Sequence, residues 1–136
     1  MKALQNISQA KRTLGRATGG IHTDKPLMYS DLKQVLDQEI PLQLTDSAII
    51  RWDYDRGYNR FVTLQGSRTL EILNATPGKY GTIKIIQDAT GSRTLTLPVN
   101  SIVMGTQGTA NLGLTTTGNT FDLASFYYDG VTFYWT

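Results

Sequence analysis

The side chains that could carry out catalysis or bind a metal are few in this sequence. His22 is its only histidine, and it holds no cysteine, which excludes disulfides, thiolate metal sites and cysteine nucleophiles. A Ser-His-Asp triad or a histidine-ligated metal centre needs further partners of defined types, and none can be assembled around His22. We therefore predict that the chain is not an enzyme and that His22 is a solvated linker residue.

One spacing matches a calcium-binding loop in part. Asp53, Asp55 and Asn59 stand at the equivalents of positions 1, 3 and 7, where oxygen ligands can wrap a hard cation. Position 12 is Leu64 instead of the bidentate glutamate, and Gly57 comes one place early. A plain turn between strands is the better interpretation, so we expect neither a metal nor a cofactor.

The other carboxylates do not predict a hydrolase. Glycoside hydrolysis needs two carboxyl groups that face each other about 5–10 Å apart. Asp88, Asp122 and Asp129 lie in or next to expected turns, Glu71 lies in an expected strand, and their spacing predicts no convergence. We expect each turn aspartate to accept hydrogen bonds from its own backbone.

Aromatic side chains beside polar loops are the remaining candidates for a binding site. Such rings could stack on a sugar or contact a receptor, and they suit packing between subunits at least as well. We prefer packing, because a β-domain this small gains most stability by oligomerising. The candidate ligand contacts are Trp52, Tyr54, Tyr58, Tyr127 and Tyr134.

Length and composition limit the class of protein. A chain of 136 residues suits one domain, and a net charge of +2 does not indicate a nucleic-acid partner. No stretch approaches the ~20 apolar residues of a membrane span, and no apolar signal-peptide core is present, so we expect no membrane insertion. Abundant Gly and Thr, with short runs of aromatic and β-branched residues, favour strands and turns.

The position of these side chains depends on a pair of repeated turns. Gly-Ser-Arg-Thr-Leu occurs at residues 66–70 and again at 91–95, each time after a run with β-type patterning. We interpret both as hairpin turns. The turn arginines, Arg68 and Arg93, could each pair with a carboxylate of a neighbouring strand or subunit, or could be exposed without a partner.

The later repeat can be read in register. A three-residue loop at 89–91 places Ile85 opposite Leu95, and in the same register residue 83 faces residue 97, which makes one sheet face apolar throughout. Gly91 then takes the left-handed conformation that such a loop needs, and Asp88 stands where a type I turn favours aspartate.

The C-terminal segment predicts the best-defined local element. A two-residue type I′ turn at Asp129-Gly130 pairs Tyr128 with Val131, residue 126 with 133 and residue 124 with 135. The core or oligomer face so formed holds Ala124, Phe126, Tyr128, Val131, Phe133 and Trp135. The opposite face carries Leu123 with two of the candidate tyrosines, which suggests a second sheet or a subunit interface.

Before the C-terminal hairpin, the expected strands are at residues 48–52, 60–64, 69–73, 82–87, 94–97 and 101–104. Residues 105–120 are rich in Gly, Thr, Asn and Gln, and we expect either an exposed loop or weak strands interrupted by Leu112 and Leu114.

The N-terminal part of the chain differs in character from the rest. Residues 1–23 hold basic side chains and no acid, and we interpret them as a flexible basic arm that orders against a partner, or alternatively as a tail without a role. The arm residues expected to attach are Lys2, Leu4, Ile7, Lys11, Arg12, Leu14 and Arg16. A short helix near 31–40, capped at Ser30 or Asp31 and ended by Pro41, follows. Its apolar face holds Leu32, Val35, Leu36 and Ile40.

Three pieces of the sequence together resemble small β-domains of bacteriophage fibre and appendage proteins. They are residues 62–70, the run Gln-Asp-Ala-Thr-Gly-Ser-Arg-Thr-Leu at 87–95, and the aromatic segment 126–135 around Tyr-Asp-Gly. The resemblance covers roughly residues 46–136, and its Gln-Asp-Ala-Thr-Gly run is fairly specific. It implies a virion structural role and symmetric oligomers, usually trimers.

We therefore expect a mainly β protein: residues 1–45 as an attachment arm with the short helix, and residues 46–136 as a small antiparallel β-sandwich or barrel-like head. The predicted function is a phage fibre or capsid-decoration subunit, a head fibre before a tail fibre, assembled in the host cytoplasm into the virion. Its partners would be further copies of itself and a capsid or appendage protein. The alternative is a carbohydrate-binding module, or a tail-fibre receptor-binding domain, that recognises a host-surface glycan.

Overall fold

The computed structural model describes residues 40–105 and 111–136. The described residues belong to one compact unit, Ile40–Thr136. The predicted basic arm and the helix expected near 31–40 lie outside them, apart from Ile40. Among the described residues, no helix is long and apolar enough to cross a membrane.

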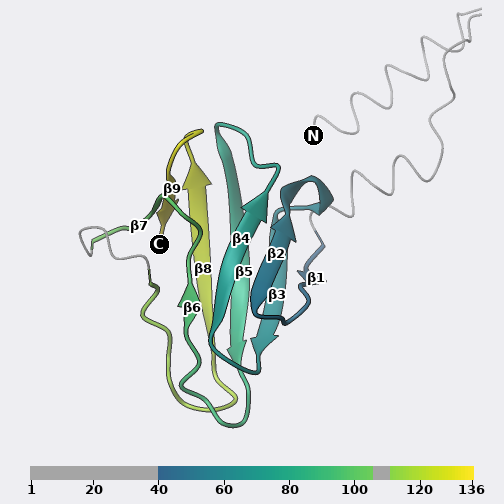
Figure 1. Cartoon of the computed structure of the whole chain (residues 1–136), viewed down its shortest axis with the longest axis vertical. Helices are drawn as coiled ribbons and strands as arrows, with labels where there is room; N and C mark the ends of the chain where they lie inside the picture. Colours follow the sequence, from purple (N-terminus) through teal and green to yellow (C-terminus); the bar gives the residue numbers. More distant parts are fainter. Residues whose placement is uncertain (1–39, 106–110) are drawn as a thin grey trace, which may run out of the picture. The chain divides into compact units, whose positions relative to one another are not determined.

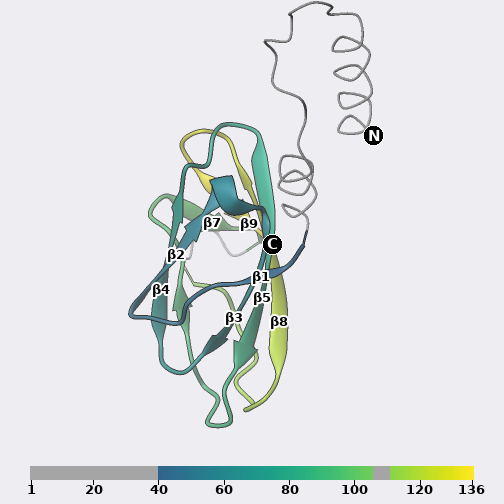
Figure 2. The ribbon, with the colours of Figure 1, turned by 90° about the vertical axis from the view of Figure 1, so that its right-hand side faces the viewer.

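Two β-sheets pack face to face, and the predicted mainly β fold is confirmed (Figure 1, Figure 2). The larger sheet has the strand order β1-β3-β5-β8-β9-β7, and the smaller has the order β2-β4-β6. The strands are β1 (Leu42–Gln43), β2 (Ile49–Asp53), β3 (Asn59–Leu64), β4 (Arg68–Leu73), β5 (Lys79–Gln87), β6 (Leu95–Thr96), β7 (Ser101–Val103), β8 (Phe121–Tyr128) and β9 (Phe133–Trp135), with a 3-10 turn η2 (Tyr54–Arg56) between β2 and β3.

The first six strands alternate between the two sheets. β1, β3 and β5 are parallel neighbours in the larger sheet, and β2, β4 and β6 are parallel neighbours in the smaller one. In Figure 1 the arrows of β2 and β4 accordingly run opposite to those of β3 and β5. The antiparallel pairs are β5 with β8 and β8 with β9, so the larger sheet is mixed and the smaller is parallel, where an antiparallel sandwich was expected.

The hairpin interpretation of the two Gly-Ser-Arg-Thr-Leu repeats is wrong. Each repeat carries the chain from the larger sheet to the smaller one, from β3 to β4 and from β5 to β6. Ile85 and Leu95 are both buried in the core, but they come from strands of different sheets. Apolar alternation fixes the face that a strand buries and not its partner, so a hairpin and a crossing between layers satisfy the same pattern.

The C-terminal hairpin forms in a different register from the one expected. Tyr128 pairs with Phe133, which leaves a four-residue turn at 129–132. Asp129 Oδ1 accepts hydrogen bonds from the backbone N–H groups of Val131 (2.8 Å) and Thr132 (2.7 Å), and these bonds favour the longer turn. Because the shift is by two residues, the predicted face is kept, but Val131 lies in the turn and is 68% exposed.

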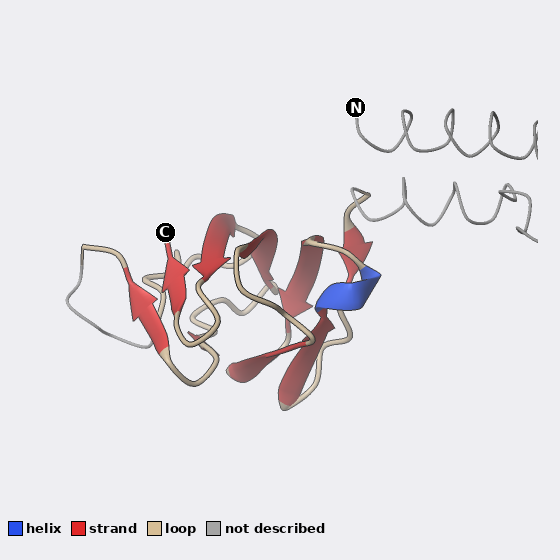
Figure 3. Ribbon diagram, turned by 90° about the horizontal axis from the view of Figure 1, so that it is seen from above, coloured by secondary structure: helices blue, strands red, loops and turns tan. Residues whose placement is uncertain are grey.

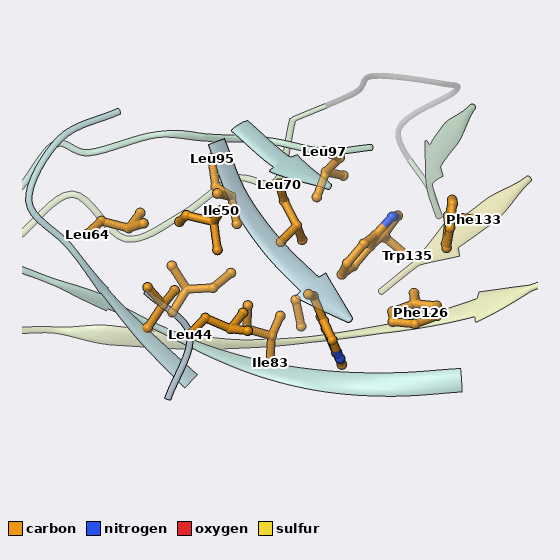
Figure 4. Close-up of a cluster of buried hydrophobic side chains, with 14 of the residues drawn as sticks. Leu44, Ile50, Leu64, Leu70, Ile83, Leu95, Leu97, Phe126, Phe133 and Trp135 are labelled. Atoms are coloured by element: carbon orange, nitrogen blue, oxygen red, sulfur yellow. The ribbon is translucent and has the colours of Figure 1, made fainter. Parts of the chain in front are cut away.

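The core fills the space between the two sheets (Figure 4). Phe126 lies among three aromatic rings, with centroid distances of 5.3 Å to Trp52, 5.4 Å to Phe133 and 5.2 Å to Trp135. Four members of the predicted C-terminal face, Ala124, Phe126, Phe133 and Trp135, are thus core residues, and Tyr128 is half-buried. Leu112 and Leu114 also pack against the core from the segment 111–120, which has one isolated bridge.

Candidate interaction surface

The outer face of the larger sheet is unusually apolar for a surface exposed to water. Side chains alternate along β5 and β8, so the residues between the buried positions point outward. Several of these are largely exposed, among them Tyr80 (61%), Phe121 (55%) and Leu123 (66%). We define the outer face by its large side chains, Phe61, Tyr80, Lys84, Ile86, Ile102, Phe121, Leu123, Tyr127 and Tyr134. The small polar side chains of Thr63, Thr82 and Ser125 point outward between them.

A shallow hollow of about 440 Å³ lies on one part of this outer face. Its lining includes Phe61 of β3, Ile86 of β5 and Leu123 of β8, which lie on three adjacent strands. Lys84 lies between them, with its Nζ 4.3 Å from the centroid of the Phe121 ring. The aromatic ring therefore stabilises the one charge among the residues that define the outer face.

Three tyrosines form a row across the other part of the outer face. Tyr80, Tyr127 and Tyr134 are successive register partners on β5, β8 and β9. The Tyr134 hydroxyl donates to Asp129 Oδ2 at 3.0 Å, and this bond to a carboxylate raises the pKa of Tyr134. The Tyr58 ring lies 5.8 Å from that of Tyr80, at the end of the row.

The structure separates the five aromatic residues predicted as ligand contacts. Tyr127 and Tyr134 belong to the outer face, and Tyr58 lies beside it. Trp52 has no exposed surface and donates from Nε1 to the Gly57 carbonyl at 2.8 Å, so this part of the prediction is wrong. Tyr54 is half-buried, with a pKa raised by burial and its hydroxyl bonded to the Tyr80 carbonyl at 2.8 Å.

Sequence reasoning missed Tyr80 as a member of the tyrosine row. The expected strand began at residue 82, whereas β5 begins at Lys79 because it pairs with β8 as far as Tyr128. The outward alternation of Lys84 and Thr82, extended by one step, would have placed Tyr80 on the same face.

The segment with calcium-loop spacing is a turn held by its own side chains. Asp53 Oδ1 accepts from the Asp55 backbone N–H at 3.1 Å and from Asn74 Nδ2 at 2.8 Å. The Asn74 bond is the main reason why the pKa of Asp53 is lowered. In the described ranges, no three or more acidic, histidine or cysteine side chains are grouped so that they could hold a metal.

The Gln-Asp-Ala-Thr-Gly-Ser-Arg run forms a closed set of hydrogen bonds. Gln87 is buried, and its side-chain amide bonds both backbone groups of Arg93, at 3.0 and 2.9 Å. Asp88 Oδ1 accepts from the backbone N–H groups of Thr90 and Gly91 at 3.1 and 3.0 Å, as predicted for a turn aspartate. Gly91 has the predicted positive φ, at 75°. The motif therefore builds a turn and leaves few polar atoms for a ligand.

Both repeat arginines are paired with carboxylates. Arg68 donates to both oxygens of Asp46 at 2.9 Å, which links the turn before β4 to the one before β2. Arg93 forms the corresponding pair with Asp88, with Nη2 and Oδ2 at 2.8 Å. These side-chain hydrogen bonds are the main cause of the lowered pKa of both aspartates. The pairs stabilise the turns.

Comparison with protein-family models, with curated proteins and with solved structures finds no match to this chain. The candidate site therefore rests on the geometry of the outer face.

Proposed function

We propose that the chain is a virion structural subunit, a phage fibre or capsid-decoration protein, whose β-domain associates with copies of itself through the outer face. The apolar outer face is the observation that carries this proposal. Large exposed apolar patches on soluble domains mark interaction sites, and the centres of protein interfaces are poor in charged residues. Of the residues that define the outer face, Lys84 alone is charged.

A second copy of the chain is the partner that the proposal names. The sequence resemblance to phage fibre domains implies symmetric oligomers, usually trimers. A small two-layer domain also gains apolar burial by association, at about 25 cal/mol for each Å² removed from water. The N-terminal segment would attach the assembly to a capsid or appendage protein while the β-domain projects from the particle.

The virion role can be tested on purified phage particles that encode this chain. Quantitative mass spectrometry should detect the chain in a fixed number of copies relative to the major capsid protein. Its loss during purification at the rate of a soluble host protein would contradict the proposal.

The second candidate function is glycan binding, and the tyrosine row is the observation that favours it. Tyr80 and Tyr127 are each at least half exposed and are direct cross-strand neighbours, so their rings can form one apolar platform for a sugar. A glycan array probed with the full chain tests this function. Binding that is lost in Tyr127→Ala but kept in Val131→Ala, a matched exposed site off the outer face, would support it.

A further inference from the structure

A second hollow lies at the edge of the sandwich formed by β1 and β2. Its volume is about 290 Å³, and its lining includes Arg56 of η2, the blue turn in Figure 3. Strands β2 and β3, the turn η2 and the segment that includes β1 all contribute to its wall. The lining residues are Leu42, Gln43, Leu44, Thr45, Arg51, Asp53, Arg56 and Arg60.

Arg60 is the unusual member of this lining. It points inward from β3 on the same side as Val62 and Leu64, and it is only 3% exposed. Its Nη1 donates to the Asn59 carbonyl at 3.1 Å, and the described residues supply no acceptor for its other N–H groups. A guanidinium keeps its charge in proteins, so Arg60 is a buried cation without an ion pair in the described part of the chain.

The neighbouring charges do not neutralise Arg60. Arg51 Nε bonds Glu71 Oε2 at 3.0 Å. Asp53 also lines the hollow and keeps its negative charge, but its Oδ1 accepts from the Asn74 side chain and the Asp55 backbone, and it forms no ion pair with Arg60. Arg56 is exposed and has no ion pair with a described residue. Burial is the main cause of the lowered pKa of Arg60, and the positive charge of Arg56 lowers it further. The negative charge of Asp53 raises the pKa, but by less.

We propose that this hollow binds a single oxyanion group, a carboxylate or a phosphate, with Arg60 as the buried ligand and Arg56 as the second cation. The planar fork of a guanidinium matches both oxyanions through two parallel N–H bonds. The lining contains no aromatic side chain, so the site recognises the anionic group itself and not a sugar ring. Arg60 also lines the hollow on the outer face, so the two hollows adjoin at this side chain, but none of the residues that define the outer face lines the oxyanion site.

The direct test is a titration followed on the arginine Nε–Hε signals of the full chain by NMR. Inorganic phosphate and sodium acetate are the two probes, each compared with sodium chloride at equal ionic strength. The Arg60 and Arg56 signals should shift and saturate with at least one oxyanion and not with chloride. The probe whose titration saturates at the lower concentration shows whether the site prefers a phosphate or a carboxylate. Shifts that stay linear, or that are equal in chloride, overturn the proposal.

Two charge-matched variants test which cations form the site. Arg56→Gln should raise the dissociation constant for the oxyanion by about fivefold or more, because the second cation is lost. Lys79→Gln removes the same charge from an exposed position outside the hollow and should change it less than about twofold. Equal weakening in the two variants would mean general electrostatic attraction and not a site.

Arg60→Met separates a binding role from a packing role. In chloride buffer the Met variant should be at least as stable as the wild type, because an unpaired buried charge is replaced by an apolar chain of similar length. The rise in melting temperature that an oxyanion gives the wild type should be absent from the variant. If neither oxyanion stabilises the wild type and the Arg60→Met variant is destabilised, then Arg60 has a packing role only, and the binding proposal is overturned.

Discussion

Single residues in the Gln-Asp-Ala-Thr-Gly-Ser-Arg run at 87–93 explain how that sequence holds its turn. The Gln87 and Asp88 side chains bond backbone groups of the same turn, Arg93 bonds the Asp88 carboxylate, and Gly91 permits a close approach to the segment 116–120. A Cβ at Gly91 would lie 2.3 Å from the Thr116 carbonyl oxygen, while Ser92 donates its N–H to that oxygen at 2.8 Å. We therefore interpret the motif as structural, because its residue types are the ones that this turn geometry requires.

Gly91→Ala should be strongly destabilising. The positive φ and the backbone clash together should cost about 3 kcal/mol or more. Gly78→Ala is the matched control, because Gly78 also has a positive φ, of 86°, but nothing lies within 4 Å of its Cβ position. It should cost about 1 kcal/mol. Urea unfolding measures both, and equal losses would contradict the packing of the turn against segment 116–120.

The paired aspartates should make stability depend on acid pH. Hydrogen bonds from Arg68 and Arg93 lower the folded pKa of Asp46 and Asp88 below 3.8. Between the folded and the unfolded pKa values the unfolded chain binds more protons. The stabilisation is therefore full above about pH 5 and is lost as the pH falls through the folded pKa values.

The measurement for this acid dependence is the urea midpoint between pH 7 and pH 2. It should be nearly constant down to about pH 5 and should then fall. Asp88→Asn should make the fall shallower. Asp55→Asn removes an equal charge from a carboxylate that has no ion pair with a described residue, and it should leave the fall unchanged. A fall that both variants alter equally would contradict the assignment to the arginine pairs.

At the scale of elements, the sequence predicts the strands well and their pairing poorly. β2, β3, β4, β6 and β7 lie close to their expected ranges, because alternation and turn residues are local signals. The pairing of β5 with β3 and β8 joins residues far apart in the sequence, which alternation cannot specify. The outer face was predicted in part, through Leu123 and two tyrosines. Trp52 is buried because the larger sheet packs against β2, and the alternation of residues within one strand does not show that a second sheet covers it.

Engineered disulfides can separate the observed pairing from the hairpin. Thr82 and Ser125 are register partners on β5 and β8 with hydroxyl oxygens 3.0 Å apart, so Thr82→Cys with Ser125→Cys should cross-link within one folded chain on mild oxidation. The native chain has no cysteine to interfere. Thr82→Cys with Pro98→Cys is the control pair, since the expected hairpin would join these positions. Preferential cross-linking of the control would contradict the topology.

At the scale of the whole molecule, the fold provides two surfaces that adjoin at Arg60. The outer face is broad, apolar and nearly uncharged, which suits association between copies. The edge hollow is small and cationic, which suits one oxyanion group. A subunit that assembles through one surface and recognises an anion through another is consistent with a structural protein on a particle.

Mass in solution, measured by light scattering on the full chain, tests the central claim most directly. The account predicts a defined oligomer for the wild type, a monomer for Leu123→Lys and an unchanged oligomer for Val99→Lys. Both side chains are largely exposed in the single chain, at 66% and 85%, so neither change should alter folding by more than about 0.5 kcal/mol. A wild-type monomer, or an oligomer that survives Leu123→Lys, would contradict the outer face as the subunit interface.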